Sequence, residues 1–342
     1  MVSVCPLRAN CGLSRSIQAV YAFPQPSGSH RDDEECAMID RRDVLVRSAT
    51  ALATSLMTPA VPAFAQATTV PSSKRGFLDR PGCRIYYEVT GSGPPIVFAH
   101  GLGSNHLTWW QQVPRFSDRY ICVTFAHRGY PPGSEIGVPD PNDFAGDLAA
   151  LIGHLQLPDV RLVAQSMGGW TSLEYILAHP DHKVRALVLA STCGTIRKQS
   201  IPLADPQRLT EWNQKAAAAR TEMARRGISP PAGERMAREQ PELHLLYRMI
   251  ANASAAFDRE ELRKRLYAMA TRPPDVLRGV SIPTLFVTGG EDTTYPPFLS
   301  DALAPLMPNA RVEQVPDSGH SVYFQRATAF NGLVDNFLLK VG

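Results

Sequence analysis

Short apolar runs alternate with stretches of helical periodicity from Gly76 to the end of the chain. The runs are rich in β-branched and aromatic residues, and several are almost continuously apolar, as strands buried on both faces of a sheet are. They occupy residues 84–91, 96–100, 120–126, 160–164, 184–190, 284–289 and 311–315. Strands that alternate with helices are typical of a mostly parallel sheet covered on both faces. The pattern therefore predicts an α/β fold.

Two of the intervening helices have a clear apolar face. In residues 140–155 the face contains Phe144, Leu148, Leu151, Ile152 and Leu155, and either Asp140 or Asn142 is placed to cap the helix. The last helix repeats the pattern with Phe330, Leu333, Val334, Phe337 and Leu338. Both helices are expected to cover the sheet.

The alternation stops between Cys193 and Val280. This segment contains helix-forming sequences separated by the pairs Pro230-Pro231 and Pro273-Pro274. It predicts a helical insertion over residues 193–277, which divides the α/β core into residues 76–192 and 278–342.

The N-terminal part of the chain differs from the rest. Residues 38–67 have a basic start with Arg41-Arg42, an apolar stretch rich in Ala and Thr, and a small-residue exit at Ala63-Phe64-Ala65. This order is typical of an export signal of the twin-arginine type, cleaved near Ala65 or Ala67. An ordinary amphipathic helix is the alternative. The apolar run is too short for a membrane span.

These features predict contact with an export machinery, no stable membrane anchoring, and a periplasmic or secreted mature protein. Residues 1–37 would then be a non-native or disordered extension, because a signal normally lies at the N-terminus. Beyond the signal the chain retains Cys83, Cys122 and Cys193. An odd number at wide spacing favours buried thiols over a disulfide framework.

Composition and motifs argue against several classes of partner and cofactor. The chain of 342 residues has 35 basic and 32 acidic side chains, and the net charge of +3 gives no reason to expect nucleic acid or an anionic membrane as a partner. The sequence has no zinc-type spacing, phosphate-binding loop or dinucleotide fingerprint. No cofactor or metal is therefore expected.

Ser166 is the first candidate for chemistry. In LVAQSMGG it lies between a predicted strand and a predicted helix, with small residues two positions before and after it. A serine in such a sharp turn presents its hydroxyl above the sheet as a nucleophile. Ala164 stands where glycine is more usual, and it adds one methyl group. A buried or capping serine is the alternative for this segment alone.

A serine nucleophile needs a base, and the base needs an acid. His320 in VPDSGHS follows the last predicted strand, and Asp292 in GGEDTTYPP follows another. Both therefore belong to the carboxyl edge of the sheet, where ligand sites of α/β proteins lie. Asp292 is preferred as the acid because of its spacing from Gly289 and Pro296, and Glu291 is the alternative.

A developing oxyanion needs two hydrogen-bond donors. AHGLGSN, residues 99–105, follows a strand, and its glycines let backbone N–H groups approach a ligand. The N–H groups of Leu102 and Met167 are predicted to form the oxyanion hole. His100 has a loop-shaping place in this segment.

Together, HGLGSN, AQSMGG, GGEDTTYPP and DSGHS resemble, in this order, the α/β-hydrolase superfamily. The resemblance implies a mostly parallel eight-stranded sheet and a cap inserted after strand 6, to which residues 193–277 correspond. The chain looks most similar to cofactor-free bacterial enol-lactonases, carboxylesterases and C–C bond hydrolases. It departs from them in AHRGYPPGS, residues 126–134, where Ala126 replaces the usual aspartate.

The expected function is hydrolysis of a carboxylic ester or lactone of a small to medium apolar substrate through an acyl-enzyme. There are two alternatives. The chain could hydrolyse a C–C bond in a diketone-like substrate, or it could be a receptor-like or binding protein with a slow or silent triad. Residues expected to contact the substrate are Trp109, Trp110, Trp170, Leu246 and Met249, with Leu243 and Ile250 on the same insertion helix.

Overall fold

The computed structural model describes residues 72–134, 136–181, 183–254 and 257–342. The predicted export signal and the extension before it lie outside the described residues, and both remain predictions. Within the described part of the chain, no helix is long and apolar enough to cross a membrane.

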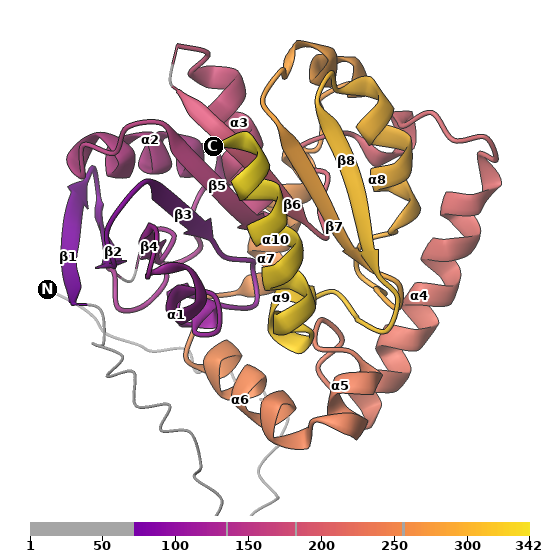
Figure 1. Cartoon of the computed structure of the whole chain (residues 1–342). Helices are drawn as coiled ribbons and strands as arrows, with labels where there is room; N and C mark the ends of the chain where they lie inside the picture. Colours follow the sequence, from indigo (N-terminus) through magenta and orange to yellow (C-terminus); the bar gives the residue numbers. More distant parts are fainter. Residues whose placement is uncertain (1–71, 135, 182, 255–256) are drawn as a thin grey trace, which may run out of the picture. The chain divides into compact units, whose positions relative to one another are not determined.

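One sheet of eight strands organises the molecule (Figure 1). The strand order is β1-β2-β4-β3-β5-β6-β7-β8, and all neighbours are parallel except the pairs β1/β2 and β2/β4. The α/β fold and the mostly parallel eight-stranded sheet are therefore confirmed. The strands are β1 Ser73–Arg80, β2 Cys83–Thr90, β3 Pro95–Ala99, β4 Ile121–Phe125, β5 Val160–Gln165, β6 Val184–Ala190, β7 Thr284–Gly289 and β8 Ala310–Val315.

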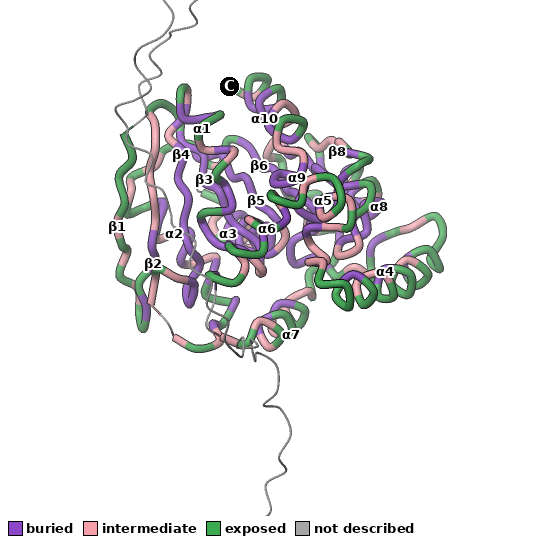
Figure 2. The backbone as a smooth tube through the Cα atoms, turned by 90° about the horizontal axis from the view of Figure 1, so that it is seen from below, coloured by how far each residue is buried: buried purple, intermediate pink, exposed green. Residues whose placement is uncertain are grey.

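Helices cover both faces of the sheet. The helices of the α/β core are η1 His106–Trp109, α1 Val113–Phe116, η2 Pro141–Asp143, α2 Phe144–His154, α3 Met167–Ala178, α8 Phe298–Leu303, η5 Ala304–Leu306, α9 Val322–Gln325 and α10 Ala327–Val341. Side chains alternate between the faces, since Val97 packs in the cluster containing α2, α3 and α8 residues, whereas Phe98 packs with α1, α9 and α10. Figure 2 shows the buried strands at the centre of the molecule.

The helix predicted over residues 140–155 begins later than its pattern suggests. Residues 141–143 form the 3₁₀ turn η2, whose N-terminus is capped by the Asp140 side chain, which accepts from Asn142 N. The α-helix begins at Phe144, and four of the five predicted apolar residues are buried. Leu155 is the C-cap and is half-buried.

The insertion leaves the core after β6 and returns before β7. It contains η3 Lys198–Ser200, α4 Gln207–Arg225, α5 Glu234–Glu239, α6 Pro241–Asn252, α7 Arg259–Met269 and η4 Pro274–Gly279. Helix α7 packs on the core through Leu262 and Leu266, which lie in one cluster with Met167 and Trp170.

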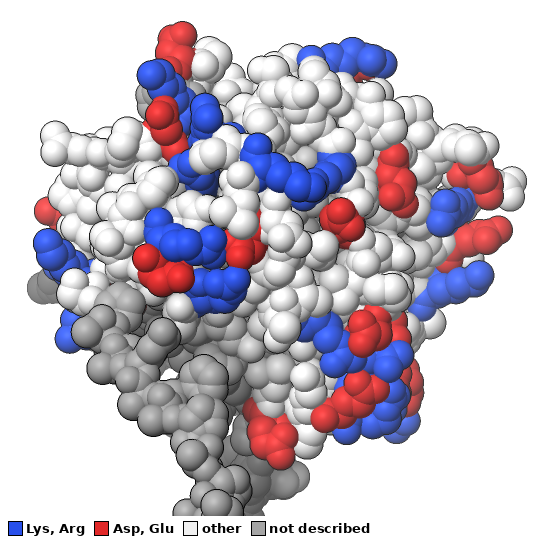
Figure 3. Space-filling model, viewed as in Figure 1, with Lys and Arg blue, Asp and Glu red and all other residues white. Residues whose placement is uncertain are grey.

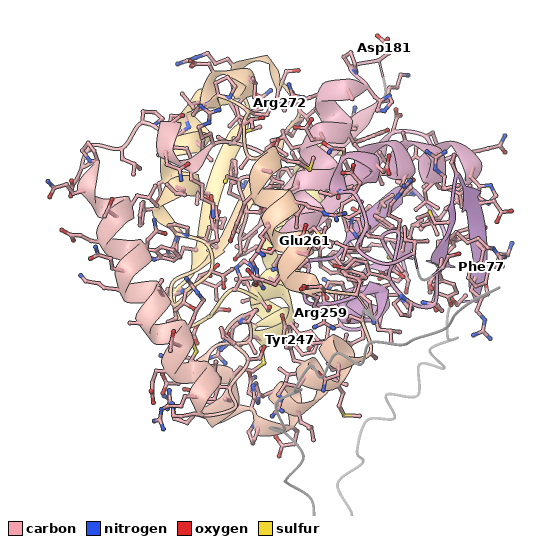
Figure 4. All side chains as sticks on the ribbon, turned by 180° about the vertical axis from the view of Figure 1, so that it is seen from behind. Phe77, Asp181, Tyr247, Arg259, Glu261 and Arg272 are labelled. Atoms are coloured by element: carbon pink, nitrogen blue, oxygen red, sulfur yellow. The ribbon has the colours of Figure 1, made fainter. Side chains whose placement is uncertain are left out.

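The two ends of the insertion are joined at a neck. Ile196 and Arg272 form a β-bridge, and Arg197 N donates to Arg272 O over 2.9 Å. The Arg272 guanidinium, labelled in Figure 4, donates to both carboxylate oxygens of Glu174 in α3 over 3.0 and 2.8 Å. Glu174 also accepts from the Thr195 hydroxyl over 2.5 Å. The insertion is thus tied to the helix that follows Ser166.

A buried carboxylate ties the antiparallel edge of the sheet to α2. The Asp147 side chain is 3% exposed and accepts hydrogen bonds from Arg80 of β1 and Arg128, which follows β4, at 2.6 to 2.9 Å. Arg128 also pairs with Asp143. These bonds fix the segment that carries Ala126 in the place of the usual aspartate.

Replacing Asp147 with Asn should lower the free energy of unfolding by about 3 kcal/mol, because it leaves two guanidinium groups without their buried counter-charge. Asp79→Asn is the matched control. Its pair with Arg84 is exposed on both sides, so its loss should change stability by about 0.5 kcal/mol. Denaturant unfolding measures both, and equal effects would refute the role assigned to Asp147.

Candidate active site

Ser166 occupies a strained turn between β5 and α3. Its φ of 49° and ψ of −114° lie in a region that non-glycine residues rarely adopt. The turn is held because Ser166 N donates to Ala190 O over 3.0 Å and Gly169 N donates to Ser166 O over 2.9 Å. The serine side chain is held at the carboxyl end of β5, as the sequence predicts.

Two close approaches explain the small residues around this turn. A Cβ at Gly168 would lie 2.1 Å from the carbonyl oxygen of Ala99 in β3, and one at Gly169 would lie 2.3 Å from Thr192. Ala164 is fully buried in β5 and pairs with Ala99 of β3 and Leu189 of β6. An alanine is accommodated at position 164, whereas position 168 has no room for any side chain.

The loop after β3 lies directly against Ser166. A Cβ at Gly101 would lie 3.3 Å from the Cβ of Ser166. The Gly101 carbonyl accepts from His100 Nδ1 over 2.9 Å and from the amide and hydroxyl of Ser104, each over 3.2 Å. Since C=O and N–H point in opposite directions across a trans peptide, this fixes the direction of Leu102 N–H.

Three further groups hold that loop. His100 is fully buried, and its Nε2 accepts from His127 N over 3.1 Å. The Tyr130 hydroxyl donates to Leu102 O over 2.9 Å. Burial lowers the pKa of His100 to about 3, and burial together with the neighbouring His100 lowers the pKa of His127 well below its usual value. Both imidazoles are therefore neutral at physiological pH and serve as positioning groups.

His320 and Asp292 form a buried pair. His320 Nδ1 lies 2.8 Å from Asp292 Oδ2, and the two side chains are 5% and 0% exposed. The other carboxylate oxygen accepts from the amides of Thr294 and Tyr295 over 2.7 and 2.9 Å. A carboxylate can only accept hydrogen bonds. Asp292 therefore selects the tautomer of His320 in which Nδ1 carries the proton and Nε2 has a free lone pair.

Glu291, the alternative acid, points elsewhere. Its carboxylate is partly exposed and accepts from the guanidinium of Arg235 in α5 over 2.5 to 3.0 Å. The structure thus brings Asp292, and not Glu291, to His320.

Backbone contacts join the loops that carry these two residues. Gly290 N donates to Val315 O and Glu291 N donates to Ser318 O, each over 2.9 Å. A Cβ at Gly289 would lie 2.1 Å from Gly319 O. The separation of Asp292 and His320 is therefore set by main-chain packing.

Ser166 and His320 line one cavity of about 120 Å³. Leu102, Met167 and Trp170 line it as well, so three further predicted residues are brought to it. Met167 is the first residue of α3, and its N–H therefore has no acceptor within the helix.

Four predicted substrate contacts, Trp109, Trp110, Leu246 and Met249, do not line this cavity, and their part in binding stays a prediction. Trp109 is fully buried against Phe98 and Tyr323, and Trp110 is 45% exposed near Phe324. The other two lie on α6: Leu246 is half-buried and packs in the cluster that contains α10, and Met249 is 59% exposed. Leu243 and Ile250 also pack in that cluster.

Tyr247 of α6, labelled in Figure 4, lines the cavity instead. Its hydroxyl accepts from the Ser321 hydroxyl over 3.0 Å, next to His320. The helical stripe was recognisable in the sequence, but the rotation of α6 was not. Lys198 and Arg263 also line the cavity, and no motif signals them. Among the described residues, no group of three His, Cys, Asp or Glu side chains could hold a metal ion.

Residues 96–333 match the model of the alpha/beta hydrolase family. The chain belongs to this family. It is 29% identical over 274 residues to a putative non-heme bromoperoxidase BpoC of Mycobacterium tuberculosis, covering 75% of this chain and 98% of the relative. It is 27% identical over 255 residues to 3-oxoadipate enol-lactonase 2 of Acinetobacter baylyi, covering 71% and 87%.

Solved structures agree on the fold of this α/β hydrolase. A thermophilic esterase from Thermogutta terrifontis superposes with a TM-score of 0.60 at 24% identity, covering 78% of this chain and 99% of that one. Relatives thus bear the names of esterases, enol-lactonases and non-heme haloperoxidases, and the substrate of this chain has to be argued from its own residues.

Gly168→Ala should prevent the Ser166 turn from forming, because the neighbouring backbone oxygen cannot yield to the new Cβ. We expect a loss of several kcal/mol in the free energy of unfolding, or no folded protein. Gly153→Ala in α2 is the control, since nothing lies within 4 Å of its Cβ, and it should be neutral or stabilising by up to about 1 kcal/mol. Thermal unfolding distinguishes them, and a stable, native-like G168A would contradict the close packing described.

The buried histidines should make stability depend on pH. Unfolded histidine binds a proton near pH 6.5, whereas folded His100 stays neutral to about pH 3. Below about pH 6.5 the unfolded state binds more protons, so the free energy of unfolding should fall as pH decreases, by up to about 1.4 kcal/mol per pH unit for each histidine. Denaturant unfolding measures the slope. His100→Asn should reduce it, and an unchanged slope would contradict the assignment.

Proposed function

We propose that this α/β hydrolase cleaves a carboxylic ester or lactone through an acyl-enzyme, with Ser166 as nucleophile, His320 as base and Asp292 as the acid that orients it. The observation that carries the proposal is the buried 2.8 Å contact between His320 and Asp292 at a cavity that Ser166 also lines. The esterase and enol-lactonase names among the similar proteins support the same chemistry.

The first half-reaction transfers the acyl group to the serine. Ser166 Oγ attacks the carbonyl carbon while its proton passes to His320 Nε2, which has the free lone pair. The imidazolium is stabilised by Asp292, whose second oxygen is already held by two amides. When the tetrahedral intermediate collapses, the C–O bond to the leaving group breaks, and the leaving oxygen takes the proton from His320.

The second half-reaction uses water. His320 takes a proton from a water molecule whose oxygen attacks the acyl carbon. It then returns that proton to Ser166 Oγ as the carboxylic acid product is released. For a lactone, the leaving hydroxyl and the acyl group belong to the same product molecule.

The negative charge on the carbonyl oxygen would be stabilised by the N–H groups of Leu102 and Met167. Support comes from two features already described: the fixed Gly101 peptide, which orients Leu102 N–H, and the position of Met167 at the start of α3. Each donor of this kind contributes on the order of a hundredfold or more to the rate.

The cavity fits a largely apolar acyl or alcohol group. Leu102, Met167, Trp170, Leu266 and Tyr267 contribute apolar surface to it.

Ser166→Ala should reduce hydrolysis of short p-nitrophenyl esters by about ten-thousandfold, because the remaining residues supply no nucleophile in its place. Ser172→Ala is the matched control: Ser172 is fully buried in α3, the helix that follows Ser166, and does not line the cavity, so the rate of this variant should be within about twofold of wild type. Initial rates and thermal unfolding of both variants provide the test.

Full activity of Ser166→Ala would refute the mechanism. A wild-type protein that hydrolyses no ester and is not labelled by a fluorophosphonate would instead favour a binding protein that keeps the fold.

A further inference from the structure

The cavity at Ser166 continues into a larger one under the insertion. The second cavity has a volume of about 800 Å³, compared with about 120 Å³ for the first. The two adjoin, since Trp170, Lys198, Pro231, Arg263, Tyr267 and Thr294 line both. A substrate longer than the inner cavity, with its scissile carbonyl at Ser166, therefore has room for its remaining part in the outer one.

The charged residues that line the two cavities all have one sign. Lys198 and Arg263 line both, and Arg220 lines the outer cavity. No Asp or Glu is among the described residues that line either cavity. This contrasts with the outer surface, where Figure 3 shows acidic and basic side chains next to one another and where Arg225 and Arg235 pair with Glu222 and Glu291.

Lys198 is the most available of these cations. It begins η3, is half-buried, and has no acidic partner within 4.0 Å among the residues that the structure describes. Its ammonium nitrogen lies 5.5 Å from the centre of the Tyr295 ring. Tyr295 is the residue whose amide donates to Asp292. A bound anion would give this charge a partner that the described protein does not supply.

The two arginines are partly engaged. Arg263 lies on α7 and pairs with Glu260 one turn earlier, with the Arg263 side chain 45% exposed. Arg220 donates to the carbonyl oxygen of Thr293 and so contributes to the loop of Asp292. Arg263 can share its charge with a ligand, whereas Arg220 has a structural role that makes it unsuitable for a test.

We infer that the substrate carries a carboxylate, remote from the scissile carbonyl, which Lys198 binds with the help of Arg263. The inference rests on the proposed ester or lactone hydrolysis and adds to it that the substrate is apolar near Ser166 and anionic at its far end. A cavity lined by cations without acids concentrates such a ligand and excludes a cationic one. The two side chains come from the insertion, so the insertion determines this selectivity.

Two matched esters test the inference. One is the mono-p-nitrophenyl ester of suberic acid, and the other is the same molecule with its free carboxylate converted to a methyl ester. We expect wild-type kcat/KM to be about tenfold higher for the acid, with the preference decreasing at high salt because a partly exposed charge is screened.

Lys198→Met should abolish most of this preference, by lowering kcat/KM for the acid about fivefold and leaving the neutral ester within about twofold. Lys198→Glu should reverse the preference. Arg263→Gln should reduce it by about threefold, since Glu260 already shares that charge. The controls are Lys215→Met, on the exposed part of α4, and Arg278→Gln, which has an equivalent pairing with Asp275 away from the cavity.

The outcomes separate this inference from the proposed function. If hydrolysis of the neutral ester depends on Ser166, the proposed function is supported, whatever the rate measured for the ester with the free carboxylate. Equal rates for the two esters in wild type, or an equal loss for both in Lys198→Met, would overturn the carboxylate site alone.

Binding provides a test that needs no turnover. Calorimetry of octanoate, which has the same chain and carboxylate but no ester bond to hydrolyse, should show binding to wild type that weakens about tenfold in Lys198→Met and not in Lys215→Met. Absence of binding to wild type, or equal affinity of the two variants, would overturn the inference even if no ester is hydrolysed.

Discussion

The contact of α3 with β3 at Gly168 is the constraint on which the rest of the site depends. The helix follows β5 without a linker, so the chain must reverse its direction at Ser166, and it does so at a positive φ of 49°. Isolated, such a conformation costs on the order of 1–3 kcal/mol. It persists because the Ala99 carbonyl approaches position 168 so closely that α3 is seated directly on the sheet.

The same packing that strains the serine also brings its neighbours into place. Once α3 is seated on β3, the loop after β3 has to pass beside Ser166, and Gly101 allows it to do so. On the other side, the loops after β7 and β8 are joined through main-chain bonds that fix Asp292 beside His320. Every candidate group therefore follows the carboxyl end of a strand, and the parallel sheet sets their spacing.

The sequence predicted best what the sheet controls. The bounds of β6 and β7 were predicted to the residue because buried parallel strands are continuous apolar runs with polar ends. The edge strand β1 was missed, since SKRGFLDR is mostly exposed and has no strong alternation. The proximity of Asp292 and His320 could be expected from topology alone, and their observed contact agrees with the sequence-based choice of Asp292 over Glu291.

The insertion was much harder to predict in detail. Its helical content was evident from composition, but the rotation of α6 was not, because a helix with apolar residues on several sides can bury more than one of them. The Ser321 hydroxyl holds Tyr247 toward the cavity, and this contact joins residues 74 positions apart. Leu246 and Met249 are accordingly on other faces. Lys198 belongs to no sequence pattern at all.

This difference in predictability corresponds to a division of roles. The core supplies the candidate groups Ser166, Asp292 and His320, whose positions are set by backbone packing. The insertion supplies side chains that line the cavity from helices joined to the core at the neck between Ile196 and Arg272. Because the neck is bound to Glu174 in α3, the insertion is anchored to the helix that begins after Ser166. Its side chains can therefore vary the charge and shape of the cavity while remaining at a constant position relative to the serine.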